Sequence, residues 1–299
     1  MTDVNLPDPG PLGFQLTTGE FAVDPGAEQQ NCYFFEVPFD HEVFVNRITL
    51  AQTSGSHHMN VFRVRTVLGL GGEPGEVVSG GECWKSPNWA DWPLVSNSQT
   101  SGIEDWQMPE GVALRFAPRE RLMLQSHYVN ATTQQTPGKA KVVVNFEGVE
   151  PASVTDELGT LFATNQEIEI CPGETSRTFE ASCKGLAKEG PVTITAANGH
   201  FHSRGKRFTM SQWDPISGTG AMFYESLSWD EPPFEKNLKV QVPAGAGISW
   251  SCEYAVKATE CGDPNNECCF TFGGFVEYQE HCNSFVYYYP KAQTDINCF

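Results

Sequence analysis

Hydrophobic residues along this chain gather in short runs rich in β-branched and aromatic side chains, and the 3.6-residue spacing of an amphipathic helix is scarce. Gly, Pro, Asn and Asp separate the runs, as expected for strands joined by turns. Examples are residues 42–50, 121–129, 141–146, 192–196, 239–242 and 284–289. Many short strands with turn residues between them favour a sandwich or barrel over a parallel sheet covered by helices. The pattern therefore predicts an all-β fold.

A chain of 299 residues suits two domains better than one. The segment 147–156, Glu-Gly-Val-Glu-Pro-Ala-Ser-Val-Thr-Asp, follows one series of predicted strands and precedes another. We expect the domain boundary in this segment, with residues 1–150 and 151–299 forming two similar antiparallel β-sandwiches. The two halves nevertheless show no convincing sequence repeat.

Composition excludes several classes of partner. The net charge of −18 argues against nucleic acid, because binding to that backbone depends on Lys and Arg. No stretch approaches the roughly 18 apolar residues of a membrane helix, so we expect no membrane span. The start Met-Thr-Asp-Val-Asn-Leu-Pro-Asp-Pro is polar and lacks a secretory apolar region. We interpret it as the start of a mature chain from which a signal peptide is absent.

Ten cysteines, an even number, are spread widely and include no Cys-x-x-Cys pair. This spacing favours disulfides formed in an oxidising compartment over a zinc ribbon. We therefore expect a secreted or periplasmic protein. Spacing alone leaves the connectivity open. Copper or zinc thiolates at Cys268, Cys269 and Cys282 are the less favoured alternative.

Six of the seven histidines fall into three small groups, and only His41 stands apart. Neutral imidazole is the commonest metal ligand and suits copper and zinc. His200 and His202 are two residues apart, so on a strand both rings point to the same face and reach one metal ion. His281, directly before Cys282, is a candidate third ligand from a distant segment.

The second candidate site combines His57, His58 and His127. Neighbours on a regular strand face opposite sides, so the adjacent pair requires a bulge or an irregular turn, for which Ser54-Gly55-Ser56 offers flexibility. His127 ends an apolar run and could complete the site from a neighbouring strand. Taken alone, His127 is better explained as a half-buried strand histidine. Sequence motifs of serine hydrolases, phosphate loops and His-Glu-x-x-His enzymes do not occur.

In order, the motifs are His57-His58-Met59, Leu-Gln-Ser-His127-Tyr, Gly-His200-Phe-His202-Ser-Arg-Gly-Lys, and His281-Cys282-Asn283 before an aromatic strand. This arrangement resembles the copper type II, ascorbate-dependent monooxygenases, the family of peptidylglycine α-hydroxylating and dopamine β-monooxygenases. The resemblance covers most of the chain and implies two jelly-roll-like domains, packed side by side, that face each other across a solvent-filled cleft. It also implies two copper ions, O2, a small reductant such as ascorbate, and a small-molecule or peptide substrate.

The resemblance implies a role for each of these histidines and a pairing for six of the cysteines. His57, His58 and His127 would hold the electron-transfer copper of the first domain. His200 and His202, with His281, would hold the oxygen-activating copper of the second domain and act as its catalytic residues. The family's disulfides match Cys32–Cys83, Cys183–Cys298 and Cys252–Cys282. Four cysteines have no clear family counterpart, and we expect them to pair with one another: Cys171, Cys261, Cys268 and Cys269.

Departures from the family pattern keep alternatives open. The family has a methionine where this chain has His281, and an imidazole is a stronger donor to Cu(II) than a thioether. An arginine and a tyrosine that hold a substrate carboxylate are replaced by Asn198 and Phe285, although Asn283 is kept, so peptidylglycine is not the expected substrate. Monooxygenase activity therefore competes with a non-catalytic copper carrier, store or electron-transfer protein. A disulfide-rich adhesion module without metal is the third hypothesis.

Overall fold

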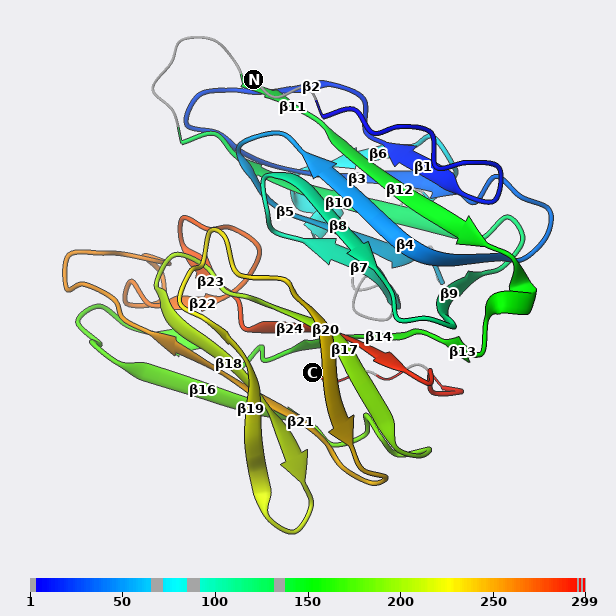
Figure 1. The fold of residues 1–299 in the computed structure, drawn as a ribbon. Helices are drawn as coiled ribbons and strands as arrows, with labels where there is room; N and C mark the ends of the chain where they lie inside the picture. The colour runs from blue at the N-terminus through cyan, green and yellow to red at the C-terminus, as the bar shows by residue number, and fades with distance from the viewer. Residues whose placement is uncertain are drawn as a thin grey trace. The chain divides into compact units, whose positions relative to one another are not determined.

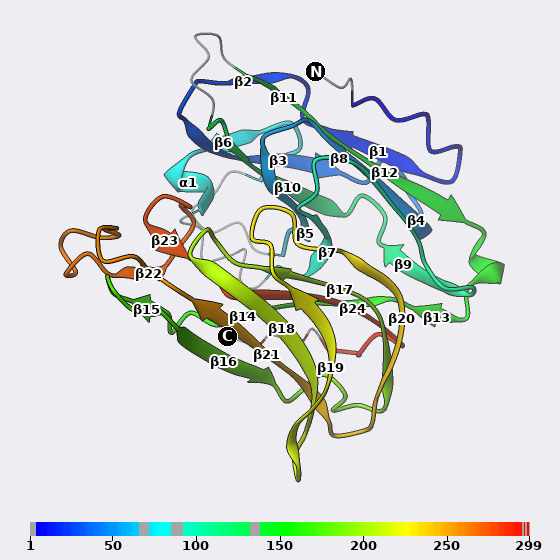
Figure 2. The same cartoon turned by 60° about the vertical axis from the view of Figure 1, so that its left-hand side comes forward.

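The computed structural model describes residues 4–65, 72–84, 92–131, 138–294, 296 and 298. The chain divides into two compact units, an N-terminal unit Met1–Thr160 and a C-terminal unit Leu161–Phe299. Both consist almost entirely of antiparallel strands (Figures 1 and 2). Within the described ranges the helical segments are α1 (Gly81–Trp84) and η1 (Pro151–Ser153). The predicted all-β fold is confirmed. None of the described helices is long and apolar enough to cross a membrane.

The N-terminal unit contains two large sheets and a small one. The first has the order β1-β12-β4-β9-β13, with β8 paired to β4; the second has the order β6-β3-β10-β5-β7; β11 pairs with β2. Their bounds are β1 Phe14–Thr17, β2 Phe21–Val23, β3 Glu28–Glu36, β4 Val43–Gln52, β5 Ser56–Arg63, β6 Val77–Ser79, β7 Leu94–Ser98, β8 Gly102–Gln107, β9 Val112–Phe116, β10 Arg121–Val129, β11 Gly138–Ala140, β12 Val142–Val149 and β13 Asp156–Glu157.

The C-terminal unit contains two four-stranded sheets, β14-β24-β17-β20 and β16-β21-β18-β19, and the small sheet β15-β22-β23. Their bounds are β14 Gly159–Thr164, β15 Glu169–Ile170, β16 Arg177–Cys183, β17 Val192–His200, β18 Gly205–Asp214, β19 Gly218–Ser226, β20 Glu235–Val242, β21 Gly247–Tyr254, β22 Phe270–Phe272, β23 Gln279–Glu280 and β24 Asn283–Tyr289.

Each unit buries aromatic and aliphatic side chains from several strands. In the N-terminal unit the ring of Phe14 stacks on Phe146 at 4.7 Å and meets Phe116 edge-on at 5.3 Å between centroids. In the C-terminal unit one core joins residues of both four-stranded sheets, such as Ile194 and Phe208. Burying side chains of this size stabilises a fold by roughly 1.5–3 kcal/mol each. The C-terminal unit is therefore sandwich-like, with its core between two sheets.

The N-terminal unit extends past the boundary expected after residue 150. Strand β13 pairs in parallel with β9, Asp156 opposite Val112. The Thr155 amide also donates to the Gly111 carbonyl at 2.8 Å. This backbone pairing holds the segment after η1 against the N-terminal sheet.

All ten cysteines lie within the described residues and form five disulfides. Three pairs are those that the family resemblance implied: Cys32–Cys83, Cys183–Cys298 and Cys252–Cys282. The four remaining cysteines pair as Cys171–Cys269 and Cys261–Cys268. Five disulfides point to folding in an oxidising, extracellular or secretory compartment.

Candidate metal centres

The first histidine group lies on two neighbouring strands of the N-terminal unit, β5 and β10. His58 stands directly opposite His127 in the antiparallel register. The next pair is Tyr128 with Ser56, so the register shifts and His57 is the extra residue of a β-bulge. A bulge re-aims a side chain that a regular strand would turn to the opposite face. Gly55, with φ of 94°, precedes the bulge in a conformation that glycine adopts without strain.

These three imidazoles, the N-terminal trio, are buried and close together. Their ring centroids lie 5.3 Å (His57–His58), 5.0 Å (His57–His127) and 4.8 Å (His58–His127) apart. With metal–nitrogen bonds of about 2.0–2.1 Å, imidazoles on one ion at ligand angles of about 90–120° have centroids roughly 4.5–5.5 Å apart. The spacing of the trio thus fits one ion, provided that one nitrogen of each ring turns toward a common point.

Hydrogen bonds engage both nitrogens of His127. Its Nδ1 lies 3.1 Å from His58 Nε2, and its Nε2 lies 2.7 Å from Glu28 Oε1. The Glu28 carboxylate can only accept, so Nε2 of a neutral His127 carries the proton and Nδ1 carries the lone pair. Metals bind through such a lone pair while the opposite nitrogen donates to a carboxylate or carbonyl.

Buried amides form a row beside the N-terminal trio. Asn97, Asn60 and Gln125 occupy paired positions on β7, β5 and β10. Asn97 donates to Asn60 at 2.6 Å, and Asn60 donates to Gln125 at 2.9 Å and lies 3.4 Å from His58 Nδ1. Buried polar groups that bond one another hold their strands in one register. The row thus supports the position of His58.

The second group lies where β17 meets β24 in the C-terminal unit. His200 is the last residue of β17 and pairs with Asn283, the first residue of β24. His202 follows His200 on the way to β18, and His281 precedes β24. Antiparallel pairing therefore brings the His200–His202 segment beside His281, although the two segments are far apart in the sequence.

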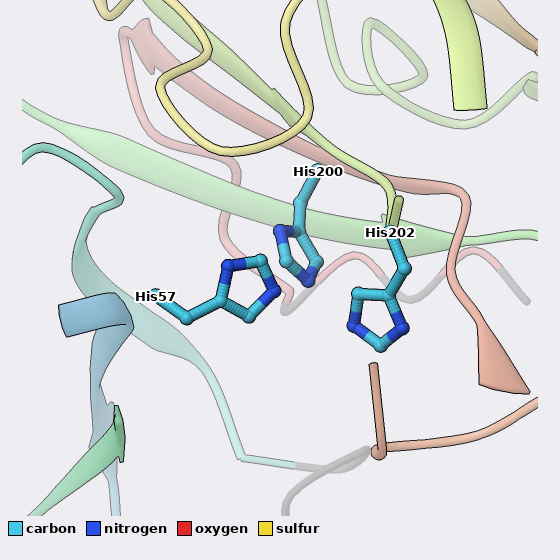
Figure 3. Close-up of side chains that lie close together, drawn as sticks. All are labelled: His57, His200 and His202. Carbon is cyan, nitrogen blue, oxygen red and sulfur yellow. The ribbon is translucent and has the colours of Figure 1, made fainter. Parts of the chain in front are cut away.

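These imidazoles, the C-terminal trio, are also buried, with exposed fractions of 2%, 0% and 2% for His200, His202 and His281. Their centroids lie 5.2 Å (His200–His202), 5.1 Å (His200–His281) and 4.5 Å (His202–His281) apart. Figure 3 shows the His200 and His202 rings, whose nearest ligand nitrogens lie within 4.8 Å. His57, also labelled there, belongs to the other unit. The C-terminal trio meets the same spacing criterion.

Contacts around the C-terminal trio orient the ring of His202 and hold the backbone of His281. His202 Nδ1 lies 2.9 Å from the Gln279 carbonyl oxygen, which can only accept, so Nδ1 of a neutral ring bears the proton and Nε2 is the atom for a metal. The Tyr254 hydroxyl donates to the His281 carbonyl. The Cys252–Cys282 disulfide ties the residue after His281 to β21. The backbone of His281 is therefore held from two sides.

Glu280 is fully buried beside His281 and the His200–His202 segment. Its carboxylate accepts the backbone amides of His202 at 2.9 Å and Arg204 at 3.0 Å. Burial raises the pKa of Glu280 to about 8, against these hydrogen bonds, which lower it. The side chain links the His200–His202 turn to the His281 strand. The sequence analysis singled out neither Glu28 nor Glu280. The one signal in the sequence for Glu280 is its position directly before His281.

Two glycines make room for this turn. A Cβ on Gly205 would overlap the ring of Phe201, and a Cβ on Gly199 would overlap the ring of Phe208. Phe201 and Phe208 are themselves buried with parallel rings, 6.1 Å between centroids. The sequence Gly-His-Phe-His-Ser-Arg-Gly thus folds around a buried Phe201, with a histidine on each side of it.

Other residues singled out in the sequence have ordinary structural contacts. Asn198 donates to the Pro233 carbonyl at 3.3 Å, and Asn283 accepts from Thr164 at 2.7 Å. Phe285 packs on Phe162 at 5.2 Å.

Comparison with known proteins finds a similar curated relative. The chain is 24% identical to tyramine beta-hydroxylase of Caenorhabditis briggsae over 297 residues, which cover 89% of this chain and 46% of the relative. The chain thus spans less than half the length of that relative. No protein-family model matches the chain.

The solved structures that are similar to the chain match it only weakly. A triple jelly-roll protein from the turret of an archaeal virus has a TM-score of 0.23 at 6% identity, covering 90% of this chain and 58% of its own. The PBSX exported protein XepA has a TM-score of 0.24 at 8% identity, covering 84% of this chain and 88% of its own. Tyramine beta-hydroxylase, to which the chain is similar over 89% of its length, is therefore the comparison that bears on function.

Proposed function

We propose that this chain is a two-copper monooxygenase that hydroxylates a C–H bond with O2 and a small reductant such as ascorbate. The N-terminal trio would serve electron transfer, and the C-terminal trio would serve oxygen activation, with His200, His202 and His281 as its catalytic residues. One observation carries the proposal: each unit gathers three imidazoles of its own at a spacing that fits one metal ion.

The donor set fits copper. Imidazole suits copper and zinc, and copper binds such ligands more tightly in the usual order of divalent ions. The similarity to a hydroxylase favours copper over zinc, because copper is redox-active. Bound copper would supply one-electron chemistry at each trio.

The residues of the chain would then set the ligand geometry. Strands carry four of the six histidines, His281 lies between β23 and β24, and His202 lies in the short turn between β17 and β18, so little reorganisation is needed when an ion binds. Glu28 and the Gln279 carbonyl select the ring nitrogen that faces the ion on His127 and His202.

A second function rests on one specific observation. His281 stands where the resembling family has a thioether, and three imidazoles favour Cu(II) more than two imidazoles and a thioether. A copper carrier, store or electron-transfer protein is therefore the competing proposal. The five disulfides favour a secreted or periplasmic location for either function.

Copper stoichiometry and oxygen consumption test the proposal together. We expect the metal-stripped chain to take up two uncoupled, nitrogen-ligated Cu(II) ions by EPR, and ascorbate with tyramine or a related phenylethylamine to drive O2 consumption matched by hydroxylated product. The His200→Ala/His202→Ala variant should bind one ion and form no product. Two ions with peroxide release alone would favour the carrier, and one ion or none in the wild type would overturn the two-copper proposal.

A further inference from the structure

We propose that Glu28 is a positioning residue of the N-terminal copper site: its carboxylate holds the Nε2 proton of His127 and presents Nδ1 to the ion. This inference rests on the proposed function and concerns a residue outside the histidine motifs. Glu28 opens β3 and pairs with Val129, two positions from the Gln30 that lies opposite His127. Such diagonal neighbours share one face of a sheet.

The contact has the geometry of a strong hydrogen bond. The Nε2–Oε1 distance is 2.7 Å, within the range of charge-assisted bonds. The His127 side chain is 0% exposed and that of Glu28 is 16% exposed. At low exposure the bond is weakly screened by solvent. The ring of His127 is therefore held in one orientation and one tautomer.

The opposite edge of the same ring is placed for a metal. With Nε2 protonated, Nδ1 bears the lone pair, and it lies 3.1 Å from His58 Nε2. Two nitrogens bound to one ion at about 2.0–2.1 Å lie about 3 Å apart when the nitrogen–metal–nitrogen angle is a right angle or slightly wider. An ion can thus replace the hydrogen bond between the two histidines when the proton of a neutral His58 moves from Nε2 to Nδ1, which frees Nε2 as a ligand atom.

The charge of Glu28 distinguishes the two trios. A carboxylate on the far nitrogen makes an imidazole a more basic donor, which stabilises Cu(II) and lowers the reduction potential. His202 of the C-terminal trio has an uncharged partner, the Gln279 carbonyl. Glu28 should therefore make the N-terminal copper the better electron donor of the pair.

Two substitutions separate charge from hydrogen bonding. Glu28→Gln keeps an acceptor oxygen but removes the charge, and Glu28→Leu removes both. Glu36→Gln is the matched control, because Glu36 ends the same strand and its carboxylate lies 3.4 Å from Arg119. Thermal unfolding and circular dichroism establish that each variant is folded before copper is added.

The first readout uses the metal-free chain of 299 residues. Nitrogen-15 NMR should find His127 protonated at Nε2 in the wild type, in Glu28→Gln and in Glu36→Gln. Glu28→Leu should show a mixture of tautomers. A wild-type ring protonated at Nδ1 would overturn the proposal, because Nδ1 could not then be the ligand atom selected by Glu28.

The second readout uses copper with a His200→Ala/His202→Ala background, in which the N-terminal trio is the expected site. Glu28→Leu should weaken copper binding about 10–100-fold, the usual effect of losing a partner of a ligating histidine. Glu28→Gln should bind more tightly than Glu28→Leu and have a higher reduction potential than the parent. Unchanged affinity and potential in both variants would overturn the role of Glu28.

The two proposals fail in different ways. If copper binds and Glu28→Leu weakens it, but ascorbate drives no product formation in the wild type, the monooxygenase proposal fails and the role of Glu28 stands. If product forms and Glu28→Leu keeps the parental affinity and potential, the role of Glu28 fails alone.

Discussion

The imidazoles of His202 and His281 lie 4.5 Å apart between centroids, although one follows β17 and the other precedes β24. Their proximity depends on the register that pairs His200 with Asn283. A slip of one residue would turn every side chain of β24 to the other face. The C-terminal trio is therefore a property of strand pairing, and several expected outcomes depend on it.

Replacing His281 by methionine should restore the thioether of the resembling family. We expect a longer and weaker third bond, to sulfur in place of nitrogen, and a higher reduction potential, because thioether favours Cu(I). X-ray absorption and potentiometry measure the two effects. His41→Met, at an exposed histidine outside both trios, is the control. An unchanged absorption spectrum would mean that His281 is not a ligand.

Removing His127 should abolish copper binding at the N-terminal trio and leave the C-terminal trio intact. The reason is that His127 contributes one of three rings within 5.3 Å of each other. The expected stoichiometry of His127→Ala is one copper per chain by EPR and metal analysis, against two for His41→Ala. Two bound copper ions per chain in His127→Ala would contradict the assignment of His127 as a ligand.

Gly205→Ala should destabilise the C-terminal unit. The added Cβ would overlap the ring of the fully buried Phe201. Overpacking of this kind costs about 1–3 kcal/mol of unfolding free energy. Gly185→Ala is the matched control, since a Cβ there meets nothing within 4 Å. Chemical denaturation compares the two, and equal stabilities would contradict the close packing of the turn.

Loss of the Cys252–Cys282 disulfide should affect both stability and metal binding. Its sequence separation of 30 corresponds to about 3.6 kcal/mol of loop-closure entropy, against about 2.4 kcal/mol for Cys261–Cys268 with a separation of 7. Alanine pairs at each disulfide give the comparison by denaturation. Copper affinity at the C-terminal trio should fall for the first pair alone, because only that bridge adjoins His281. Equal affinity losses would refute this anchoring role.

The buried carboxyl of Glu280 should make stability depend on pH. Burial raises its pKa from 4.5 to about 8 in the folded chain, so the native state binds the proton more tightly than the unfolded state. Its contribution to stability is therefore complete below about pH 4.5 and is lost as the pH rises through about 8. Unfolding of metal-free wild type and Glu280→Gln over this range measures it. A difference in stability that does not change with pH would contradict a raised pKa.

Strand positions followed directly from local sequence. The runs 121–129 and 284–289 correspond to β10 and β24, because β-branched and aromatic side chains suit half-buried, pleated backbone wherever they gather. The adjacent pair His57-His58 predicted a bulge, and β5 has its register shift at that point. These features depend on neighbours in the chain, so the sequence contained them.

The partners of the histidines were decided only by the tertiary structure. Glu28 meets His127, and Glu280 joins the backbone of His202, through strand pairings between segments far apart in the chain. Nothing local marks such a carboxylate, since its role depends on the register of another strand and on the burial that surrounds it. The sequence alone determined the all-β character and the inventory of imidazoles and cysteines; the packing of the sheets decided which groups orient each imidazole, because hydrogen bonds act only between atoms that the fold brings together.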